Sequence, residues 1–282
     1  MIQVKNVYFS YTDSPFIENI NFNVGKGEIL GFLGPSGAGK STLQKILTGL
    51  LSNYQGEVIV NGTDLTKKDS SFYEDIGIDF EFPSLYEKFT AVENLKFFGS
   101  LYSKELVPID ELLEMIGLSN DGNKKVSEYS KGMKSRLNFI KALIHRPDVI
   151  FLDEPTSGLD PANSRIMKGI IRRLKEQGKT IIVTTHNMHD AAELCDRVAF
   201  IIDGKIKALD TPRNLMKSKD GAKIVYTYYY NGKECSNEVQ TSATSSNEQL
   251  AQLLAENRIL SIHSMEPTLE DIFVELTGRR LQ

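Results

Sequence analysis

Short apolar runs separated by turn residues mark the first part of the chain. Between residues 2 and 32 these runs are of β type, and they are broken at residues 11–15 and 25–27. The pattern predicts strands joined by turns, with the last strand leading into a glycine-rich loop. Behind that loop, residues 41–51 carry apolar side chains at a helical spacing, at Leu43, Ile46, Leu47 and Leu50. We expect an amphipathic helix there, with these four side chains on its buried face.

The pattern changes in the middle of the chain. Between about residues 84 and 147 strand signals disappear and helical periodicity takes over, for example at Leu112, Leu113 and Ile116 before Gly117. We expect a helical subdomain inserted into a β-rich core. Residues 149–152 and 180–183 then form short, almost wholly apolar runs, which are typical of parallel strands covered on both faces. Helical sequence separates these runs, so the pattern predicts a βαβ crossover.

A third pattern begins after residue 211. Two β-type runs at residues 223–230 and 233–241 flank Asn231-Gly232, which is a strong hairpin signal. We expect a separate α+β module over residues 218–282, following a domain that ends at residue 217. Within this module we expect a polar loop at residues 242–247, a helix containing Leu250, Leu253 and Leu254, a short strand at residues 259–262, and a helix from Thr268 to Gly278.

Composition and charge narrow the classes of function. With 40% hydrophobic and 25% charged residues in 282, the chain can bury a core without metal or disulfide support. The formal net charge of −4 gives no basic field for nucleic acid, so we expect no nucleic-acid partner. Cys195 and Cys235 are too few for a disulfide scaffold. No signal peptide or bilayer-spanning apolar run is visible, so we expect a cytoplasmic chain.

The loop before the predicted helix carries the pattern G-x-x-x-x-G-K-[ST]. In such a loop the backbone N–H groups cradle phosphate oxygens, and glycine is needed because a side chain would block that approach. We expect Lys40 to neutralise the β- and γ-phosphates and Ser41 to ligate Mg²⁺, while the helix adds its N-terminal partial charge. The expected phosphate-site residues are Gly34, Pro35, Ser36, Gly37, Ala38, Gly39, Lys40, Ser41 and Thr42.

Two adjacent carboxylates follow the apolar run at residues 149–152. A strand-end aspartate in a phosphate-loop protein holds Mg²⁺, directly or through water, which is the role we expect of Asp153. The neighbouring Glu154 can orient the attacking water as a general base. These two motifs fit many nucleotide hydrolases and kinases, so a further signal is needed to choose among them.

Three more motifs supply that signal. Residues 129–133 read Tyr-Ser-Lys-Gly-Met before a predicted helix, residues 157–160 read Ser-Gly-Leu-Asp after Glu154, and residues 184–186 read Thr-Thr-His at a strand end. Together with the phosphate loop, their order and spacing resemble the ABC ATPase family over about residues 2–215. The resemblance implies a P-loop NTPase fold with a parallel-sheet α/β core, an antiparallel β subdomain and an inserted helical subdomain, extended here by the C-terminal module.

The resemblance also implies roles for single residues. ATP would be the nucleotide, His186 would be the catalytic switch histidine that touches the γ-phosphate, and Tyr11 would stack on adenine. Asp160 would belong to the loop that follows the catalytic glutamate. The signature loop would consist of Ser130, Lys131, Gly132 and Met133. In the family two subunits lie head to tail, and each signature loop closes on the ATP of the other, so the resemblance implies a second ATPase subunit as partner.

Two places depart from the commonest family pattern. The signature has lysine and methionine at Lys131 and Met133, although Ser130 and Gly132 remain. Residues 76–90 resemble a loop of the family that usually carries glutamine where this chain has Glu81; we expect Glu81 to keep an oxygen ligand for Mg²⁺ and to add a charge. This loop resembles that of fluoroquinolone-exporter ATPases, and residues 266–279 resemble the ending of ABC-2-type exporter ATPases.

These features predict the ATP-hydrolysing subunit of an ABC exporter. The resemblance implies a separate transmembrane permease as partner and a place on the cytoplasmic face of the membrane. A DNA-repair or translation ATPase is an alternative, but the chain has no sustained heptads and only one cassette. A nucleotide sensor without turnover is another alternative, against which the intact Glu154 argues. The sequence leaves the cargo and the choice between homodimer and heterodimer open.

Overall fold

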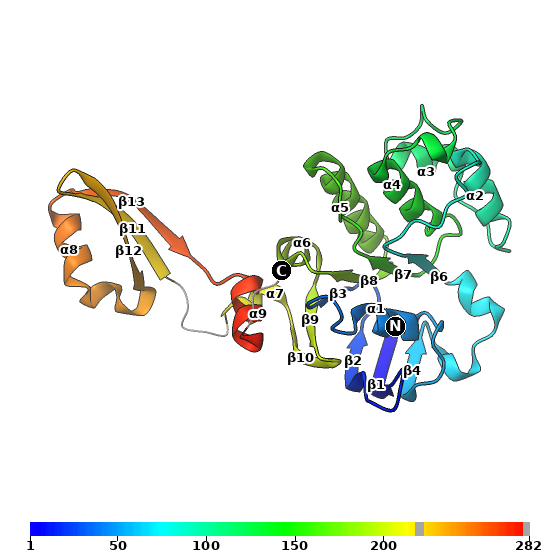
Figure 1. The fold of residues 1–282 in the computed structure, drawn as a ribbon, viewed down its shortest axis with the longest axis horizontal. Helices are drawn as coiled ribbons and strands as arrows, with labels where there is room; N and C mark the ends of the chain where they lie inside the picture. Colours follow the sequence, from blue (N-terminus) through cyan, green and yellow to red (C-terminus); the bar gives the residue numbers. More distant parts are fainter. Residues whose placement is uncertain (218–222, 279–282) are drawn as a thin grey trace. The chain divides into compact units, whose positions relative to one another are not determined.

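The computed structural model describes residues 1–217 and 223–278. Backbone contacts divide the chain into two compact units, the first ending at Leu209 and the second beginning at Asp210 (Figure 1). The domain boundary expected between residues 217 and 218 adjoins residues outside the described ranges, as does the end of the exporter-like segment at Arg279.

An antiparallel sheet opens the first unit. Its strands are β1 (Ile2–Phe9), β2 (Ile17–Val24), β4 (Gln55–Val60) and β5 (Thr63–Asp64), in the order β2-β1-β4-β5. In β1 buried and exposed side chains largely alternate, so one face packs inward, as expected for an antiparallel strand with one solvent face. The strands and turns predicted for residues 2–32 are confirmed.

A second sheet forms the α/β core. It contains β3 (Ile29–Leu33), β6 (Ile76–Asp79), β7 (Val149–Asp153), β8 (Thr180–Thr185), β9 (Arg197–Ile202) and β10 (Lys205–Asp210), in the order β10-β9-β3-β8-β7-β6. Strands β6, β7, β8, β3 and β9 run parallel. Helix α5 (Pro161–Glu176) connects β7 to β8, which confirms the predicted βαβ crossover.

The helix behind the glycine loop is shorter than expected. Helix α1 covers Lys40–Leu47 and buries Leu43. It contributes to a core that also contains side chains from both sheets. The expectation that Leu50 lies on the buried face is wrong, because 52% of this residue is exposed. Gly49 turns into the left-handed region at φ 70°, which ends the helical spacing before Leu50.

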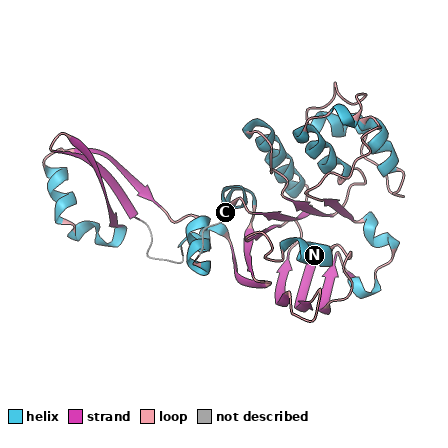
Figure 2. Ribbon diagram, in the orientation of Figure 1, coloured by secondary structure: helices cyan, strands magenta, loops and turns pink. Residues whose placement is uncertain are grey.

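Helices fill the predicted insert (Figure 2). Short 3₁₀ helices η1 (Leu65–Lys67) and η2 (Ser70–Glu74) precede β6, and the insert itself contains α2 (Ala91–Gly99), α3 (Ile109–Met115), η3 (Val126–Glu128) and α4 (Lys131–Lys141). Thr90 and Glu93 form a capping box that starts α2. The expected apolar positions are fully or almost fully buried at Leu112, Leu113 and Ile116. The helical subdomain is therefore confirmed. Helix α6 (Met188–Leu194) follows β8.

The second unit has its own small core. Its elements are α7 (Pro212–Lys217), β11 (Lys223–Tyr230), β12 (Lys233–Gln240), η4 (Thr241–Ser246), α8 (Glu248–Ala255), β13 (Ile259–Met265) and α9 (Leu269–Thr277), with sheet order β12-β11-β13. The predicted hairpin is confirmed, because Asn231 and Gly232 both have positive φ, as a two-residue hairpin turn requires. The core consists of Tyr226, Tyr228, Val239, Leu250 and Leu253.

Three details of this unit differ from expectation. Residues 241–246 form the 3₁₀ helix η4 where a polar loop was expected, because Thr and Ser hydroxyls bond back to carbonyls three or four residues earlier. Strand β13 extends to Met265, since it pairs with β11 along almost its full length. Leu254 is 51% exposed and lies outside the small core, because α8 covers the sheet with a single face.

Candidate active site

The glycine loop joins β3 to α1 in a conformation that only glycine fits. Gly34 has a φ of 156°, and a Cβ atom placed on it would lie 2.1 Å from the carbonyl oxygen of Ile201. Gly39 has a φ of 108°, and its Cβ would lie 2.7 Å from Ile17. Gly37 also has a positive φ, but nothing lies within 4 Å of its Cβ position. The loop is therefore packed against the protein on one side and open on the other.

Lys40 crosses the loop that it follows. Its ammonium group donates to the carbonyl oxygens of Gly34 at 2.7 Å and Pro35 at 3.0 Å. Burial lowers the pKa of Lys40, while the carboxylates of Glu154, Asp153 and Glu81 act in the opposite direction. The lysine is thus a half-buried cation facing three carboxylates.

The open side of the loop fits a phosphate group. Among the residues that the structure describes, no hydrogen-bond acceptor is found for the N–H groups of Lys40 and Ser41 at the start of α1. Unpaired N–H groups at a helix N-terminus, beside a cation and glycines without side chains, are the parts of an anion site. The residues present therefore fit the nucleotide that the sequence implies.

Asp153 lies at the carboxyl end of β7, opposite Thr184 of β8. The Thr184 hydroxyl donates to an oxygen of Asp153, and the N–H of Glu154 donates to the carbonyl oxygen of Thr184 at 2.9 Å. The backbone of Glu154 has a φ of 52°, which is uncommon for a residue other than glycine. This turn bends the chain away from the sheet directly after Asp153.

The Glu154 carboxylate is held by the end of β8. Oε2 accepts from the Thr185 hydroxyl at 3.1 Å, and Oε1 accepts from the backbone N–H of His186 at 3.0 Å. Nδ1 of His186 lies 2.7 Å from the same Oε1. The Glu154 side chain is only 11% exposed, whereas that of His186 is 59% exposed. The structure thus brings the two residues predicted to act on the γ-phosphate into direct contact.

A small cavity next to these groups collects residues from four separate motifs. It measures about 80 Å³. Glu81 and Lys131 contribute to its lining together with Asp153, Glu154 and Ser157. Two of the residues that depart from the commonest family pattern, Glu81 and Lys131, therefore line the same cavity.

The signature residues contact the loop after Glu154 within the same chain. A Cβ atom on Gly132 would lie 3.5 Å from Leu159, and one on Gly158 would lie 3.5 Å from the Lys131 ammonium. Ser130 caps α4 by accepting from the N–H of Met133 at 3.2 Å. In the described part of the chain, no hydrogen bond joins residues 130–133 to the glycine loop.

Asp160 and Tyr11 have local partners. Asp160 caps α5 by accepting from the N–H groups of Ala162 and Asn163, both at 3.0 Å. The Tyr11 hydroxyl lies 3.0 Å from the hydroxyl of Thr42, so its ring stands beside the phosphate loop. Tyr11 is 57% exposed, and its ring packs edge to face against the rings of Phe9 and Phe16. Adenine stacking by Tyr11 stays a prediction.

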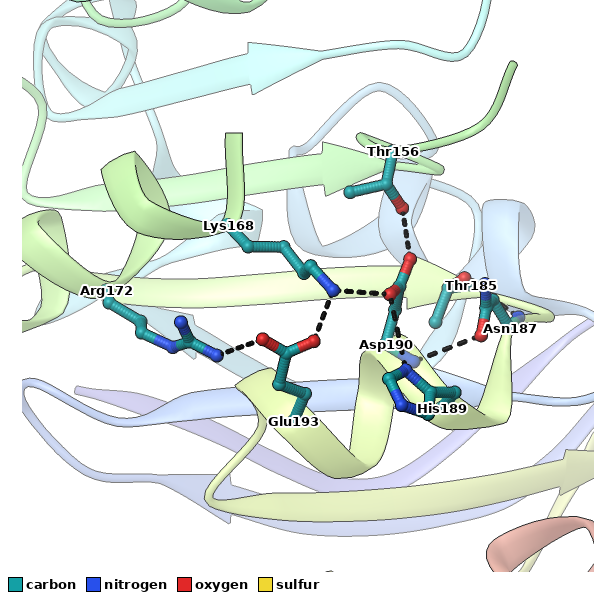
Figure 3. A network of polar contacts seen from close by, with 8 residues as sticks. All are labelled: Thr156, Lys168, Arg172, Thr185, Asn187, His189, Asp190 and Glu193. Atoms are coloured by element: carbon teal, nitrogen blue, oxygen red, sulfur yellow. Dashed lines mark hydrogen bonds and ion pairs between the residues drawn. The ribbon is translucent and has the colours of Figure 1, made fainter. Parts of the chain in front are cut away.

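A polar network that includes Thr156, two residues after Glu154, was missed by the sequence reasoning (Figure 3). The Thr156 hydroxyl donates to Asp190 at 2.7 Å, and the Lys168 ammonium donates to Asp190 at 3.0 Å and to Glu193. Arg172 pairs with the other oxygen of Glu193. The network thereby joins the segment after Glu154 to α5 and α6. The sequence signal for it was a basic pair four residues apart, Lys168 and Arg172, and an acidic pair three residues apart, Asp190 and Glu193.

The acidic side of this network resembles a cation site. His189, Asp190 and Glu193 lie close enough together to share a metal ion. The buried ammonium group of Lys168 already pairs with both carboxylates, however, so the charge is balanced within the protein. The network is therefore a set of ion pairs that fixes the two helices.

The sequence of this chain is similar to those of export and resistance ATP-binding proteins. The profile of the family described as "ABC transporter" matches residues 17–157. A fluoroquinolones export ATP-binding protein of Mycobacterium tuberculosis is 44% identical over all of this chain and 94% of its own length. The linearmycin resistance ATP-binding protein of Bacillus subtilis is 32% identical, covering both chains fully. The Nod factor export ATP-binding protein I of Rhizobium meliloti is 36% identical over all of this chain and 89% of its own.

Solved structures give the same result. The ATP-binding subunit of an ABC transporter superposes with a TM-score of 0.70 at 28% identity, covering 77% of this chain and 92% of that one. A dimeric ATP-binding cassette in a post-hydrolysis state, bound to ADP and Pi, superposes with a TM-score of 0.68 at 26% identity, over 75% of this chain and 98% of that one. The fold expected for the core is confirmed by these neighbours.

Proposed function

The chain belongs to the ABC transporter family as an ATP-binding, ATP-hydrolysing subunit, and from this premise we propose that it powers export through a separate transmembrane permease. The observation that carries the proposal is the group at the carboxyl edge of the parallel sheet. There Lys40 stands behind the glycine loop and faces Asp153, Glu154 and Glu81. A triphosphate held by the loop would place its terminal phosphate among these groups.

Mg²⁺ is the metal that this set of ligands fits. Ser41, Glu81 and Asp153 would hold it, since hydroxyl and carboxylate oxygens are the ligands that Mg²⁺ prefers. When bound, the metal neutralises charge that develops on the phosphate oxygens. Lys40 adds a second positive charge, for which its ammonium must leave the carbonyl oxygens of Gly34 and Pro35.

Glu154 is the proposed general base. Its carboxylate is fixed by Thr185 and His186, so it is oriented before substrate binds. The His186 side chain is 59% exposed and would meet the γ-phosphate. A carboxylate that holds a water in line with the terminal phosphate is the usual requirement for hydrolysis of this kind.

We propose a head-to-tail pair of ATPase subunits as the working unit. The signature residues Ser130, Lys131, Gly132 and Met133 make no hydrogen bond to the glycine loop in the described part of their own chain. The start of α4 behind Ser130 is an N-terminus suited to a phosphate, which a second subunit can supply. The dimeric cassette among the solved structures supports this arrangement.

The membrane partner follows from the relatives, whose names describe export and resistance to antibiotics. No helix in the described residues has the length and apolar character needed to cross a membrane. We therefore propose that a permease does the crossing and that this subunit works at its cytoplasmic face. The repair, translation and sensor alternatives are not favoured by these relatives, and we propose no nucleic-acid partner.

The test is purification from native membranes. The chain is captured with and without ATP, and any multi-span protein that accompanies it is identified by mass spectrometry. The proposal requires such a partner and an ATPase activity of the complex that responds to the transported compound. A chain that hydrolyses ATP but repeatedly elutes without a membrane protein would contradict the proposed export function.

A further inference from the structure

A single buried amide holds both ends of the loop that carries Glu81. The Nδ2 group of Asn138 donates to Asp79 at 2.5 Å and to the carbonyl oxygen of Phe80 at 3.2 Å. Its Oδ1 accepts from the N–H of Ser84 at 3.3 Å. Asn138 is only 2% exposed, and it lines the cavity that contains Glu81. Loop 80–84 is therefore pinned directly before and three residues after Glu81.

The contact comes from the signature helix. Asn138 lies on α4, which begins directly after Ser130, and its neighbours Leu137, Phe139 and Ile140 are all fully buried. One turn further, the Lys141 ammonium donates to the carbonyl oxygen of Ser84 at 3.0 Å and lies 4.7 Å from the centre of the Phe98 ring. Helix α4 thus supplies two side chains to the same short loop.

Packing alone does not explain these polar groups. A buried amide or carboxyl loses free energy unless it is hydrogen-bonded, and an apolar pair at positions 79 and 138 would avoid that loss. Asp79 is 5% exposed, and among residues 1–217 and 223–278 the one hydrogen-bond donor to its carboxyl group is Asn138. The remaining two bonds of Asn138 go to the loop backbone. The pattern is that of a side chain that fixes a loop, as an orienting residue does beside a site.

We propose that Asn138 is a positioning residue that couples Glu81 to the signature helix, so that the loop and α4 move as one body. The proposal rests on the proposed function, because it gives Glu81 a place at the nucleotide. Glu81 reaches the phosphate site only when α4 is correctly placed, and α4 carries the loop that would close on the second subunit's ATP. Contact of Glu81 with the phosphate site would therefore favour contact of the signature loop with the second subunit's ATP, and the reverse.

The chain offers a close control. Asn94 is another fully buried asparagine with three hydrogen bonds to backbone groups, two to Tyr86 and one to Thr90. It fixes the segment that follows the Glu81 loop, and its three side-chain hydrogen bonds go to Tyr86 and Thr90 and none to residues 80–84 within the described chain. Loss of Asn94 should disturb the helical subdomain comparably while leaving Glu81 in place.

The first test measures the loop itself without substrate. The chain contains no tryptophan, and Phe82 is 78% exposed, so Phe82→Trp places a single fluorophore in the loop. Time-resolved anisotropy should show at least a twofold larger amplitude of fast motion when Asn138→Ala is added, and little change with Asn94→Ala. Equal mobility in all three folded proteins would overturn the proposal.

The second test is a double-mutant cycle on turnover. Asn138→Ala should lower kcat about tenfold, because small misplacements of a reacting group cost rate, and leave KM for ATP nearly unchanged. In a Glu81→Ala background the same change should have less than a twofold effect. Undiminished loss of kcat in that background would show a general structural role and contradict the proposal.

Two outcomes keep this proposal separate from the proposed function. If Glu81→Ala alone leaves kcat unchanged, the role of Glu81 at the metal is wrong, yet the anisotropy test still decides whether Asn138 holds the loop. If Asn138→Ala does not fold, Asp79→Val with Asn138→Ala removes both buried polar partners and restores an apolar pair. That double variant should fold with a mobile loop, and a rigid loop in it would overturn the proposal.

Discussion

At the residue scale, Glu154 shows how the fold prepares a reacting group. Its left-handed backbone at φ 52° costs of order 1–3 kcal/mol and persists only because the surroundings fix it. Those surroundings are the carbonyl oxygen of Thr184, which accepts its N–H, and the donors of Thr185 and His186, which hold its carboxylate. The side chain is therefore oriented by β8 and the residue that follows it.

The first prediction concerns Glu154→Gln. The amide keeps the shape of the side chain and one oxygen that can accept from the N–H of His186, while its NH2 group can donate to the Thr185 hydroxyl, so ATP binding should be retained. Turnover should fall about 10²–10⁴-fold, the usual cost of losing a general base. Steady-state ATPase rates and fluorescent-nucleotide affinity check both statements. The variant should also accumulate as an ATP-bound dimer, and a strictly monomeric protein at saturating ATP would favour a mixed pair of subunits.

Lys40→Ala should act on ATP binding, in contrast to Glu154→Gln, which should act on turnover. Removing the ammonium group leaves Asp153, Glu154 and Glu81 without the cation that faces them, so added phosphate charge has less compensation. ATP affinity should fall by at least tenfold, about 1.4 kcal/mol, with turnover lost as a consequence. Equilibrium binding of ATP and of adenosine distinguishes the loss of a charge contact to phosphate from a misfolded loop. Adenosine affinity should be unchanged, and a matching loss for adenosine would indicate a misfolded loop.

Glu81→Gln tests the departure from the family pattern. Glutamine keeps the shape and an oxygen ligand while it removes one of the four carboxyl groups that line the cavity. ATP binding should be maintained or tightened, and turnover should stay within about tenfold, or about 1.4 kcal/mol in the barrier. The ATPase rate is measured from pH 6 to 9. A collapse comparable to that of Glu154→Gln would assign acid–base chemistry to Glu81.

At the scale of elements, the sequence predicted what local rules govern and missed what tertiary contacts govern. Asn231-Gly232 and the capped helix from Thr268 to Gly278 were predictable because their turn and cap chemistry is local. The end of α1 was misjudged, since the apolar spacing continues to Leu50 although Gly49 ends the helix. The residues Thr156 and Asp190 were missed because their partners lie on other elements.

The fourth prediction belongs to α4. Burial lowers the pKa of Lys141 to about 8 from 10.5, opposed by the nearby Asp79 carboxyl. Because the folded pKa is the lower one, the unfolded chain binds more protons between pH 8 and 10.5. The free energy of unfolding should therefore rise across this window relative to Lys141→Met, by on the order of 2 kcal/mol. Urea denaturation at pH 7.5, 9 and 10.5 measures the difference.

Lys134→Met on the same helix is the control for this series. Lys134 pairs with the exposed carboxylate of Glu87, so its loss should change stability by an amount typical of surface pairs, about 0–1 kcal/mol. The free energy of unfolding of wild type minus that of Lys141→Met should be constant below pH 8 and increase above it. A difference that shrinks with rising pH would mean that burial does not disfavour the Lys141 ammonium.

At the scale of the molecule, the motifs predicted from the sequence meet because of topology. Asp153 ends β7 and Glu81 follows the neighbouring strand β6, and parallel strands end at one edge, so their proximity was predictable. The contact of Lys131 with Gly158 was not, because it depends on how the helical insert packs on the core. The same holds for Asn138, because a polar residue among the apolar Leu137, Phe139 and Ile140 does not say which groups it meets.

The last prediction concerns the division of the chain. All residues proposed for the nucleotide precede Leu209, where the first compact unit ends, and the second unit has its own core around Tyr226. Truncation after Leu209 should therefore leave ATP affinity within about tenfold, or about 1.4 kcal/mol. Truncation after Lys217 should behave worse, because α7 packs with α9 in the second unit and loses that cover, which exposes Leu215. Aggregation of the longer fragment and solubility of the shorter one, measured by light scattering beside nucleotide titration, is the expected result. If the soluble shorter fragment lost ATP affinity by more than tenfold, the second unit would have to be assigned a part in the site.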